Sequence, residues 1–264
     1  MDYRLDGKTA FVSGSTAGIG FSIAELLARE KATVIVNGRT WERVESAIGK
    51  IHDSVPGSGV DGIACDLSTA EGANEIISRF PDFDILVNNM GIFEPRPFEL
   101  ISDEDWLRLF EANVMSGVRL SRYYLPVMKR KNWGRIIFVS SESAVQIPAE
   151  MIHYGMTKSA QIAVARGMAE TTVGTGVTVN SVLPGPTRSE GVGGFVRKMA
   201  EKQGKTFEEM EKEFFREVRP TSLLKRFTET HEVAHLVVYL ASPLSSATNG
   251  AAMRVEGGVV RSML

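Results

Sequence analysis

A tyrosine and a lysine stand four residues apart in the chain, at Tyr154 and Lys158. Residues with this spacing lie on one face of a helix, so both side chains would point into the same space. A phenol has a usual pKa of ~10, which is too high for a base near neutrality. An ammonium ~4 Å away, at an effective dielectric of ~20, supplies about 4 kcal/mol, enough to lower that pKa to about 7. The pair could therefore transfer a proton to or from a substrate oxygen.

The same spacing is also common on exposed helices that do no chemistry, so the pair needs independent support. One supporting feature is Ser141, which ends an apolar run and precedes Tyr154 by 13 residues (154 − 141). The other is a glycine-rich loop near the beginning of the chain. Together they favour a site of proton transfer over a plain helix surface.

The elements that must position these residues are short apolar, β-branched runs separated by helix-length segments. Continuous apolar strands of this kind are typical of parallel strands buried on both faces. We therefore predict an α/β fold: a doubly wound parallel β-sheet flanked by helices, Rossmann-type, in three α/β/α layers. No Pro/Gly-rich linker divides the chain, so residues 1–264 are predicted to form one domain. The predicted strands are 9–14, 32–38, 62–65, 84–89, 134–141, 177–185 and 251–255.

One region, residues 186–228, departs from this alternation because it is charged and has no buried-strand pattern. We call it the insertion segment. Thr206 followed by Glu209 forms a capping-box signature for a helix start. An apolar stripe at helical spacing follows, made of Phe207, Met210, Phe214 and Val218. The segment is either a packed surface helix or a lid over a substrate cleft, and these two interpretations are compatible.

The glycine-rich loop, SGSTAGIG, places Gly14, Gly18 and Gly20 between the first predicted strand and the first predicted helix. Glycines there allow a tight turn and let backbone N–H groups approach a pyrophosphate at the helix N-terminus. The spacing differs from the usual G-x-G-x-x-G fingerprint of dinucleotide-binding folds. The strand before it and the helix after it favour a phosphate-binding loop over an ordinary turn.

The second predicted strand ends in Asn37 and Gly38, and no acidic residue follows before Glu42. An acid at this place would bind the ribose hydroxyls of NAD. Arg39 stands there instead, and a guanidinium suits the 2′-phosphate of NADP, which a carboxylate would repel. We therefore expect NADP(H) in preference to NAD(H); the alternative is that Arg39 is a solvated loop charge.

Eight short motifs occur along the chain in a fixed order: SGSTAGIG (13–20), CDL (65–67), NNMG (88–91), ANV (112–114), VSS (139–141), YGMTK (154–158), NSVLPGPT (180–187) and EGG (256–258). With this set the chain closely resembles the classical short-chain dehydrogenase/reductase family, over nearly its whole length. It departs from the family pattern at Met90, where alanine is usual, and at Ser13, where threonine is usual.

The resemblance implies a nicotinamide cofactor and a place for each of its parts. The loop would wrap the pyrophosphate, Asp66 and Leu67 would flank the adenine, and the residues after the sixth strand would hold the nicotinamide. The residues predicted to bind the cofactor are Gly14, Ser15, Thr16, Gly18, Ile19, Gly20, Arg39, Thr40, Asp66, Leu67, Asn89, Gly91, Tyr154, Lys158, Pro184, Gly185 and Thr187.

The implied catalytic group is Asn113, Ser141, Tyr154 and Lys158, with Ser141 preferred to Ser140 because of the family's usual interval. Reducing a ketone by hydride transfer leaves an alkoxide that needs a proton, and oxidising an alcohol requires removal of that proton. Tyr154 would be the acid and base, with its pKa lowered by Lys158. Ser141 would stabilise negative charge on the carbonyl oxygen, and Asn113 would hold a water that links Lys158 to solvent.

Composition and charge also limit the partners, the compartment and the metal sites that we expect. The net charge of −2 suggests neither a nucleic-acid nor a membrane partner. The single cysteine, Cys65, fits a reducing compartment, and the chain start does not look like a secretory signal, so we expect a cytoplasmic protein. No metal site is predicted, because neither an H-E-x-x-H motif nor a nearby cysteine accompanies the i, i+4 pair His231 and His235.

The function expected from these observations is NADP(H)-dependent hydride transfer to or from a small-molecule ketone or secondary alcohol. Within the same family, a 3-oxoacyl carrier-protein reductase and a sugar dehydrogenase remain open. A carrier protein would want a basic entrance, which Arg188, Arg197, Lys198 and Lys202 could form, although glutamates are interspersed. From a different class, a non-catalytic NADP(H)-sensing regulator is the alternative, but such proteins typically lose the tyrosine or the lysine.

The resemblance also implies a homo-oligomer, commonly a homotetramer built partly through the helices after ANV and after YGMTK. The second of these helices is rich in small residues, which would allow another helix to approach closely: Ala160, Ala163, Ala165, Gly167 and Ala169. The same residues also suit packing on the protein's own sheet.

Overall fold

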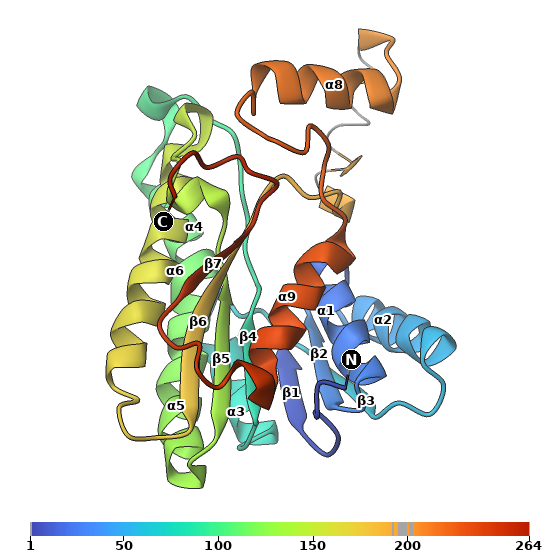
Figure 1. Ribbon diagram of the computed structural model, residues 1–264, viewed down its shortest axis with the longest axis vertical. Helices are drawn as coiled ribbons and strands as arrows, with labels where there is room; N and C mark the ends of the chain where they lie inside the picture. Colours follow the sequence, from blue (N-terminus) through green and yellow to red (C-terminus); the bar gives the residue numbers. More distant parts are fainter. Residues whose placement is uncertain (1, 192, 195–199, 201–202, 264) are drawn as a thin grey trace.

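A computed structural model describes residues 2–191, 193–194, 200 and 203–263. Its strands all run parallel in one seven-stranded sheet, in the order β3-β2-β1-β4-β5-β6-β7 (Figure 1). The strands are β1 (Thr9–Val12), β2 (Thr33–Gly38), β3 (Val60–Ala64), β4 (Ile85–Asn88), β5 (Gly134–Val139), β6 (Val177–Pro184) and β7 (Ala252–Val255). The predicted fold class is confirmed.

Helices connect the strands and cover the sheet. The α-helices are α1 (Gly18–Arg29), α2 (Trp41–Ser54), α3 (Ala70–Arg79), α4 (Asp103–Phe110), α5 (Ser116–Lys131), α6 (Ile152–Glu170), α8 (Phe207–Glu217) and α9 (Thr230–Ala241). A π-helical turn, η2 (Glu111–Met115), joins α4 to α5. Short 3-10 turns are η1 (Phe98–Leu100), η3 (Glu142–Ala144), η4 (Ala149–Met151) and η5 (Pro243–Ser245). Within the described residues, none of these helices combines the length and apolar character needed to cross a bilayer.

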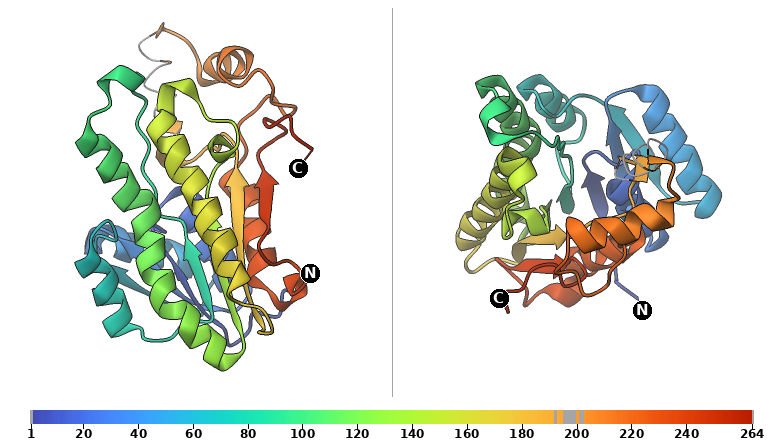
Figure 2. Two further views of the ribbon diagram at one scale, coloured as in Figure 1. Left: turned by 90° about the vertical axis from the view of Figure 1, so that its left-hand side faces the viewer. Right: turned by 90° about the horizontal axis from the view of Figure 1, so that it is seen from above.

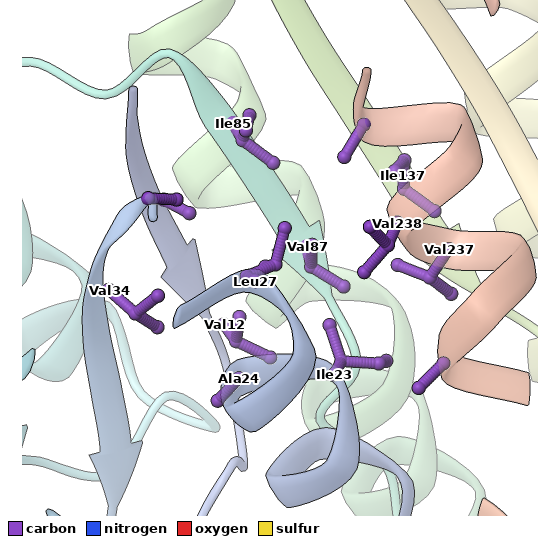
Figure 3. Close-up of a cluster of buried hydrophobic side chains, with 14 of the residues drawn as sticks. Val12, Ile23, Ala24, Leu27, Val34, Ile85, Val87, Ile137, Val237 and Val238 are labelled. Carbon is purple, nitrogen blue, oxygen red and sulfur yellow. The ribbon is translucent and has the colours of Figure 1, made fainter. Parts of the chain in front are cut away.

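The two faces of the sheet are covered by different helices because successive strand residues point to opposite sides. Val12 and Val87 belong to a core with residues of α1, α2 and α9, part of which is drawn in Figure 3. Their neighbours Phe11 and Leu86 belong to a second core with residues of α3, α5 and α6. The result is the three-layer arrangement seen from two further directions in Figure 2.

The strand order reverses direction between β1 and β4. From β1 the chain winds outward through β2 to β3, and from β4 it winds the other way to β7. At such a switch point, the two connections leave the carboxyl ends of the strands in opposite directions and open a crevice between them. The loop that follows β1 and the loop that follows β4 therefore face each other there.

The insertion segment leaves the sheet after β6 and returns before α9. Thr187 and Thr228 form an isolated parallel bridge, and their hydroxyls lie 2.9 Å apart. Two further hydrogen bonds fix this neck: Thr228 N–H donates to the Pro186 carbonyl at 2.9 Å, and Arg188 N–H donates to the Thr228 carbonyl at 2.8 Å. In Figure 1 α8 lies at the top of the molecule, apart from the helices that cover the sheet.

The predicted helix start in this segment is confirmed, since Thr206 and Glu209 form a reciprocal capping box at α8. The predicted apolar stripe is correct only in part. Met210 and Phe215 are buried with Phe227, while Val218 is 43% exposed. The helix ends at Glu217, so Val218 no longer continues its apolar face.

Candidate active site

The phosphate loop is shaped by glycines that no other residue could replace without strain. Gly14 and Gly18 have φ angles of 61° and 60°, in the left-handed region that favours glycine. A Cβ on Gly20 would lie 2.4 Å from the Asn89 side chain and 2.5 Å from the Gly14 carbonyl oxygen. Ala17, the N-cap of α1, provides no side-chain acceptor for the first helical N–H groups. The loop thus brings a helix N-terminus to the crevice in a form suited to an anion.

A cleft of about 1230 Å³ opens at this crevice. Its walls come from the phosphate loop, the start of α2, the end of β3, the loop after β4 and residues 189–191 of the insertion segment. The predicted cofactor residues that line it are Gly14, Thr16, Gly18, Ile19, Gly20, Arg39, Thr40, Asp66, Leu67, Asn89 and Gly91. Its position and its glycine walls fit a dinucleotide.

Ser15 contributes to the loop from the inside. Its side chain is fully buried, donates to the Val12 carbonyl at 2.7 Å and accepts from Asn37 N–H at 2.9 Å. The predicted residues Pro184, Gly185 and Thr187 lie at the end of β6, outside the lining of this cleft. A Cβ on Gly185 would lie 2.6 Å from the Glu256 carbonyl oxygen, so a glycine is required there.

The end of the cleft at β2 carries positive charge. Asn37 occupies the place of the missing acid, and its Oδ1 accepts from Gly14 N–H at 3.2 Å. A Cβ on Gly38 would lie 2.5 Å from Thr16 Cγ2, so a larger residue there would displace the Thr16 side chain. Arg39 and Arg43 are both exposed and both line the cleft. Arg43 also pairs with Glu190 of the insertion segment at 3.5 Å, between two exposed side chains.

The floor of the cleft is held by hydrogen bonds from the loop after β4. Asn89 donates through Nδ2 to the carbonyls of Ser13 and Gly14, at 2.9 and 3.1 Å. The Ser13 hydroxyl accepts from the N–H groups of Asn89 and Met90, both at 2.9 Å. Met90, the departure from the family motif, packs its side chain against the core beneath α3 and α5. Because it accepts these two hydrogen bonds, the Ser13 hydroxyl fixes the backbone of Asn89 and Met90 at the cleft floor.

Asn113 lies in the π-helical turn η2 and is fully buried. Its Oδ1 accepts from Ile92 N–H at 2.7 Å, and its Nδ2 donates to the Ile92 carbonyl at 3.0 Å and to Thr157 Oγ1 at 2.9 Å. These bonds tie the loop after β4 to α6. The predicted water-holding role of Asn113 remains a prediction.

Tyr154 and Lys158 lie in the first two turns of α6, as their spacing predicts. The Lys158 ammonium lies 5.6 Å from the centre of the Tyr154 ring and donates to the Val139 carbonyl at 3.0 Å. Gly91 connects this pair to the cleft, since a Cβ there would lie 3.2 Å from Lys158 Nζ and 3.5 Å from Asn113 Oδ1. The structure thus brings Asn113, Tyr154 and Lys158 together beside the cleft floor.

The protonation of the pair differs from the prediction. Burial lowers the pKa of Lys158 to about 7. Burial also raises the pKa of Tyr154, and the charge of Glu142 adds to this rise, whereas a hydrogen bond from Ser141 and the charge of Arg219 oppose it. These directions are opposite to the expected lowering of the Tyr154 pKa, and Lys158 is not among their causes, so its role toward the phenol remains a prediction. Both groups are removed from water, which disfavours the charged form of each.

The two candidate serines have different partners. Ser140 donates to the Lys158 carbonyl at 2.8 Å and so fixes the backbone of α6. Ser141 caps η3, accepts from Ser143 N–H at 3.1 Å and donates to Glu142 Oε2 at 2.6 Å. The choice of Ser141 for the catalytic group remains a prediction.

Sequence reasoning missed several residues of the site. Gln161 accepts from Lys158 Nζ at 3.2 Å and donates to the Asn113 carbonyl at 2.5 Å. Its position three residues after Lys158 on the same helix is the signal that could have found it. Arg43, four residues after Arg39, carries the same kind of signal. Glu142 follows Ser141 directly, but nothing in the sequence shows that its side chain turns back toward the serine.

Comparisons with known proteins agree with this geometry. The family model described as enoyl-(acyl carrier protein) reductase matches residues 14–260. The chain is 48% identical over 263 residues to the uncharacterised oxidoreductase YvaG of Bacillus subtilis, covering 100% of both chains. It is 34% identical over 260 residues to the D-beta-hydroxybutyrate dehydrogenase of Cupriavidus necator, covering 97% of this chain and 99% of the relative.

A solved structure gives the same result. The L-sorbose reductase of Gluconobacter frateurii, complexed with NADPH and L-sorbose, has a TM-score of 0.92 and 29% identity over 100% of both chains. The strand order, the glycine-lined cleft and these relatives lead to one assignment. The chain belongs to the short-chain dehydrogenase/reductase family and is an NAD(P)-dependent oxidoreductase acting on CH–OH and C=O groups.

Proposed function

We propose that the protein is an NADP(H)-dependent reductase of small hydroxyketones, or equivalently a dehydrogenase of the matching secondary alcohols. The observation that carries this proposal is that Asn113 and Lys158 both approach Gly91 in the cleft lining, with the Tyr154 ring beside the Lys158 ammonium. Ser141 would complete the group, since it is close enough to Tyr154 to lower the pKa of the phenol. A non-catalytic sensor would not need this assembly.

The residues present fit a nicotinamide dinucleotide. Gly14 and Gly18 give the loop left-handed backbone angles, and the N-terminus of α1 offers N–H groups to a pyrophosphate at the cleft. Residues 14–20 would hold the pyrophosphate, Asp66 and Leu67 the adenine, and Lys158 the nicotinamide ribose. Pro184, Gly185 and Thr187 would stand at the nicotinamide end. When bound, the cofactor supplies or accepts the hydride.

A preference for NADP(H) is supported by the charge at the adenosine end. Arg39 and Arg43 both line the cleft where β2 ends, and Asn37 stands where an acid would repel a 2′-phosphate. Only Arg39 was evident as a candidate from the sequence. Two guanidiniums on adjoining turns could share the phosphate oxygens by charge-assisted hydrogen bonds.

The pKa shifts of Tyr154 and Lys158 indicate which group donates the proton during reduction. Tyr154 is protonated near neutral pH, because burial and Glu142 raise its pKa, so it can donate to the alkoxide formed during ketone reduction. Ser141 would hold the carbonyl oxygen beside the phenol. Lys158, with a pKa of about 7, is close to its own midpoint and can replace the proton of Tyr154.

A neutral, hydroxylated substrate is supported by the charges near Ser141. Two carboxylates, Glu142 and Glu150, stand against one guanidinium, Arg219, so a substrate carboxylate would meet net negative charge. The sugar substrate named for the sorbose reductase is of this neutral kind. A carrier-protein substrate has less support: Arg188 is paired with Glu211 and Glu229. Arg197, Lys198 and Lys202 lie outside the described residues.

We also propose the organisation around the site. Residues 1–264 form a single domain, with the insertion segment over the substrate side of the cleft. The protein is cytoplasmic and assembles as a homotetramer, as the family resemblance implies.

The test is cofactor oxidation with a panel of ketones. Purified protein is mixed with NADPH or NADH and with neutral hydroxyketones, simple ketones or a 3-oxo acid such as acetoacetate. We expect turnover with NADPH and a neutral hydroxyketone, and weaker turnover with the 3-oxo acid. Tight NADPH binding with no turnover across the panel would favour the sensor instead.

A further inference from the structure

Gln161 is a buried carboxamide that lies between the lysine of the proposed catalytic group and the turn that carries Asn113. Its Oε1 accepts from Lys158 Nζ at 3.2 Å, and its Nε2 donates to the Asn113 carbonyl at 2.5 Å. An ammonium can only donate and a carbonyl can only accept, so the group between them must do both. A carboxamide meets this need, because its oxygen accepts while its nitrogen donates.

The Lys158 ammonium is buried, and its partners are neutral oxygens. Besides Gln161, it donates to the Val139 carbonyl at 3.0 Å. Burial lowers the pKa of Lys158, and no charged side chain among the described residues contributes to this shift. Two of the three N–H groups of the ammonium are thus used by Val139 and Gln161. The third is left for a partner on the side of the cleft, where a Cβ on Gly91 would lie 3.2 Å from Nζ.

The other end of the Gln161 side chain binds the π-helical turn η2. Asn113 is held from α6 twice, since its Nδ2 donates to Thr157 Oγ1 at 2.9 Å and its carbonyl accepts from Gln161. Asn113 in turn hydrogen-bonds both backbone groups of Ile92, which follows Gly91 in the cleft lining. Gln161 therefore connects the ammonium to the turn that fixes this part of the cleft.

We propose that Gln161 is a positioning residue, which fixes the Lys158 ammonium between β5 and η2 so that its third N–H is directed to the cofactor. This inference rests on the proposed function, because it assigns Lys158 to the nicotinamide ribose and to the supply of protons. Gln161 itself lies outside the cleft lining, so it acts through Lys158. Without Gln161 the ammonium would keep one carbonyl partner on a flexible four-carbon stem.

The carboxamide also affects the charge of the ammonium, because a hydrogen bond to the charged form favours that form. Removing the acceptor should lower the pKa of Lys158 below its value of about 7, and a carboxylate in its place should raise it. In reduction the ammonium replaces the proton of Tyr154, so kcat falls as pH rises through the pKa of Lys158. The phenol loses its own proton at higher pH, because burial raises its pKa.

Other titratable and charged groups lie around this pair. Tyr154 has its ring centre 5.6 Å from the ammonium. Glu142 of η3 and Arg219 of the insertion segment shift the pKa of the phenol in opposite directions. His153 is buried against Trp106 of α4. All of them are unchanged in the variants below, so a difference between variants comes from the substituted side chain.

The experiment compares Gln161→Met with Gln161→Glu, using the best ketone of the panel and NADPH. Gln161→Met keeps the length of the side chain but lacks the carboxamide, so kcat should fall by about tenfold to a hundredfold, as for a lost hydrogen bond to a charged group. The alkaline midpoint of its kcat profile should move to lower pH, and that of Gln161→Glu to higher pH. A purely structural role would move neither midpoint, or would move both in one direction. Each variant has its own predicted direction, so either decides the outcome if the other fails to fold.

The matched control makes the reverse exchange on the same helix. Glu170→Gln changes an exposed carboxylate at the end of α6 that pairs with Arg166, and it should keep the kcat and the midpoint of the unchanged protein.

A binding measurement tests the inference without turnover. Gln161→Met should weaken NADPH binding, measured by fluorescence titration, by about twofold to tenfold, the range of one hydrogen bond. In a Lys158→Met background the same substitution should have no further effect, because the ammonium that Gln161 positions is gone. Equal losses in the two backgrounds would overturn a role that acts through Lys158.

The results separate this inference from the proposed function. If the unchanged protein reduces no ketone, the proposed function fails, while the binding measurement still tests Gln161. If the protein is active but Gln161→Met and Gln161→Glu keep the kcat and the midpoint of Glu170→Gln, the function stands and the positioning role of Gln161 is wrong.

Discussion

Tyr154 and Lys158 are both removed from water, and this desolvation disfavours the charged form of each side chain. The phenol therefore holds its proton, while the ammonium gives up its proton near neutral pH. This protonation state suits reduction, because the phenol already carries its proton when the alkoxide forms. In oxidation the phenol must first lose its proton, which favours alkaline conditions.

The role of the phenol is tested by Tyr154→Phe. The variant keeps the ring beside Phe93 but has no proton to donate, so kcat for ketone reduction should fall by about 10²–10⁴-fold. NADPH affinity, measured by fluorescence titration, should change little. Tyr123→Phe, on the half-exposed part of α5, is the matched control and should retain full activity. Undiminished turnover by Tyr154→Phe would refute the assignment.

The buried ammonium also affects stability. Because the pKa of Lys158 is lowered from 10.5 to about 7, the unfolded chain binds more protons between these values, and stability from this group rises with pH there. The cost at low pH is of the order of ~1.4 kcal/mol for each unit of the shift. Lys158→Met lacks this cost. Its Tm relative to the unchanged protein should be highest at or below pH 7 and should decline toward pH 10. A constant Tm difference would show that burial does not perturb this lysine.

Arg39, which precedes the N-cap of α2, and Arg43, in the first turn of α2, both line one end of the cleft. If these guanidiniums bind a 2′-phosphate, Arg39→Ala/Arg43→Ala should raise KM for NADPH by about tenfold to a hundredfold, the loss expected for charge-assisted hydrogen bonds. KM for NADH should change little, because NADH has no phosphate there. Arg29→Ala on α1 serves as a control, since its partner is Glu25 on the helix surface. Equal effects on both cofactors would overturn the preference for NADP(H).

The π-helical turn η2 could not be predicted from the hydrophobic pattern of the sequence. The stretch 102–129 predicts helix, and helix forms, but nothing in its periodicity marks the widened turn that carries Asn113. Such turns are frequent at functional sites. The turn is a local rearrangement of the backbone, and its tertiary partners Ile92 and Thr157 come from other parts of the chain.

The layered architecture was predictable because burial on both faces leaves continuous apolar runs in the sequence, as in β4 and β5. The phosphate loop was predictable because its backbone angles require glycine. The pKa of Tyr154 and the Glu142–Arg219 pair were not. They depend on burial and on two side chains separated by 77 residues in the chain. Similarly, the spacing of α8 did not distinguish Phe215 from Val218 as the buried residue.

The outer face of α6 offers a surface for assembly. Ala165 and Ala169 face the protein's own sheet, while Ala163 and Gly167 are exposed on the opposite side. Ala163→Arg would place a long charged side chain on this exposed face. If α6 packs on a second copy, the variant should elute as a smaller species in size-exclusion chromatography with light scattering. Arg29→Ala, exposed on α1 at the other face of the sheet, is the control and should preserve the size of the assembly. An unchanged mass for Ala163→Arg would exclude this helix from the interface.

The neck at Thr187 and Thr228 makes the insertion segment a closed excursion, since the chain leaves and re-enters the fold at one bridged point. None of the seven strands lies between Thr187 and Thr228, and the entropy of closing a loop rises only with the logarithm of its length. Segments of different length could be exchanged at this point between relatives while the hydride-transfer machinery is left in place. The choice of substrate could then change by replacement of this segment as one unit.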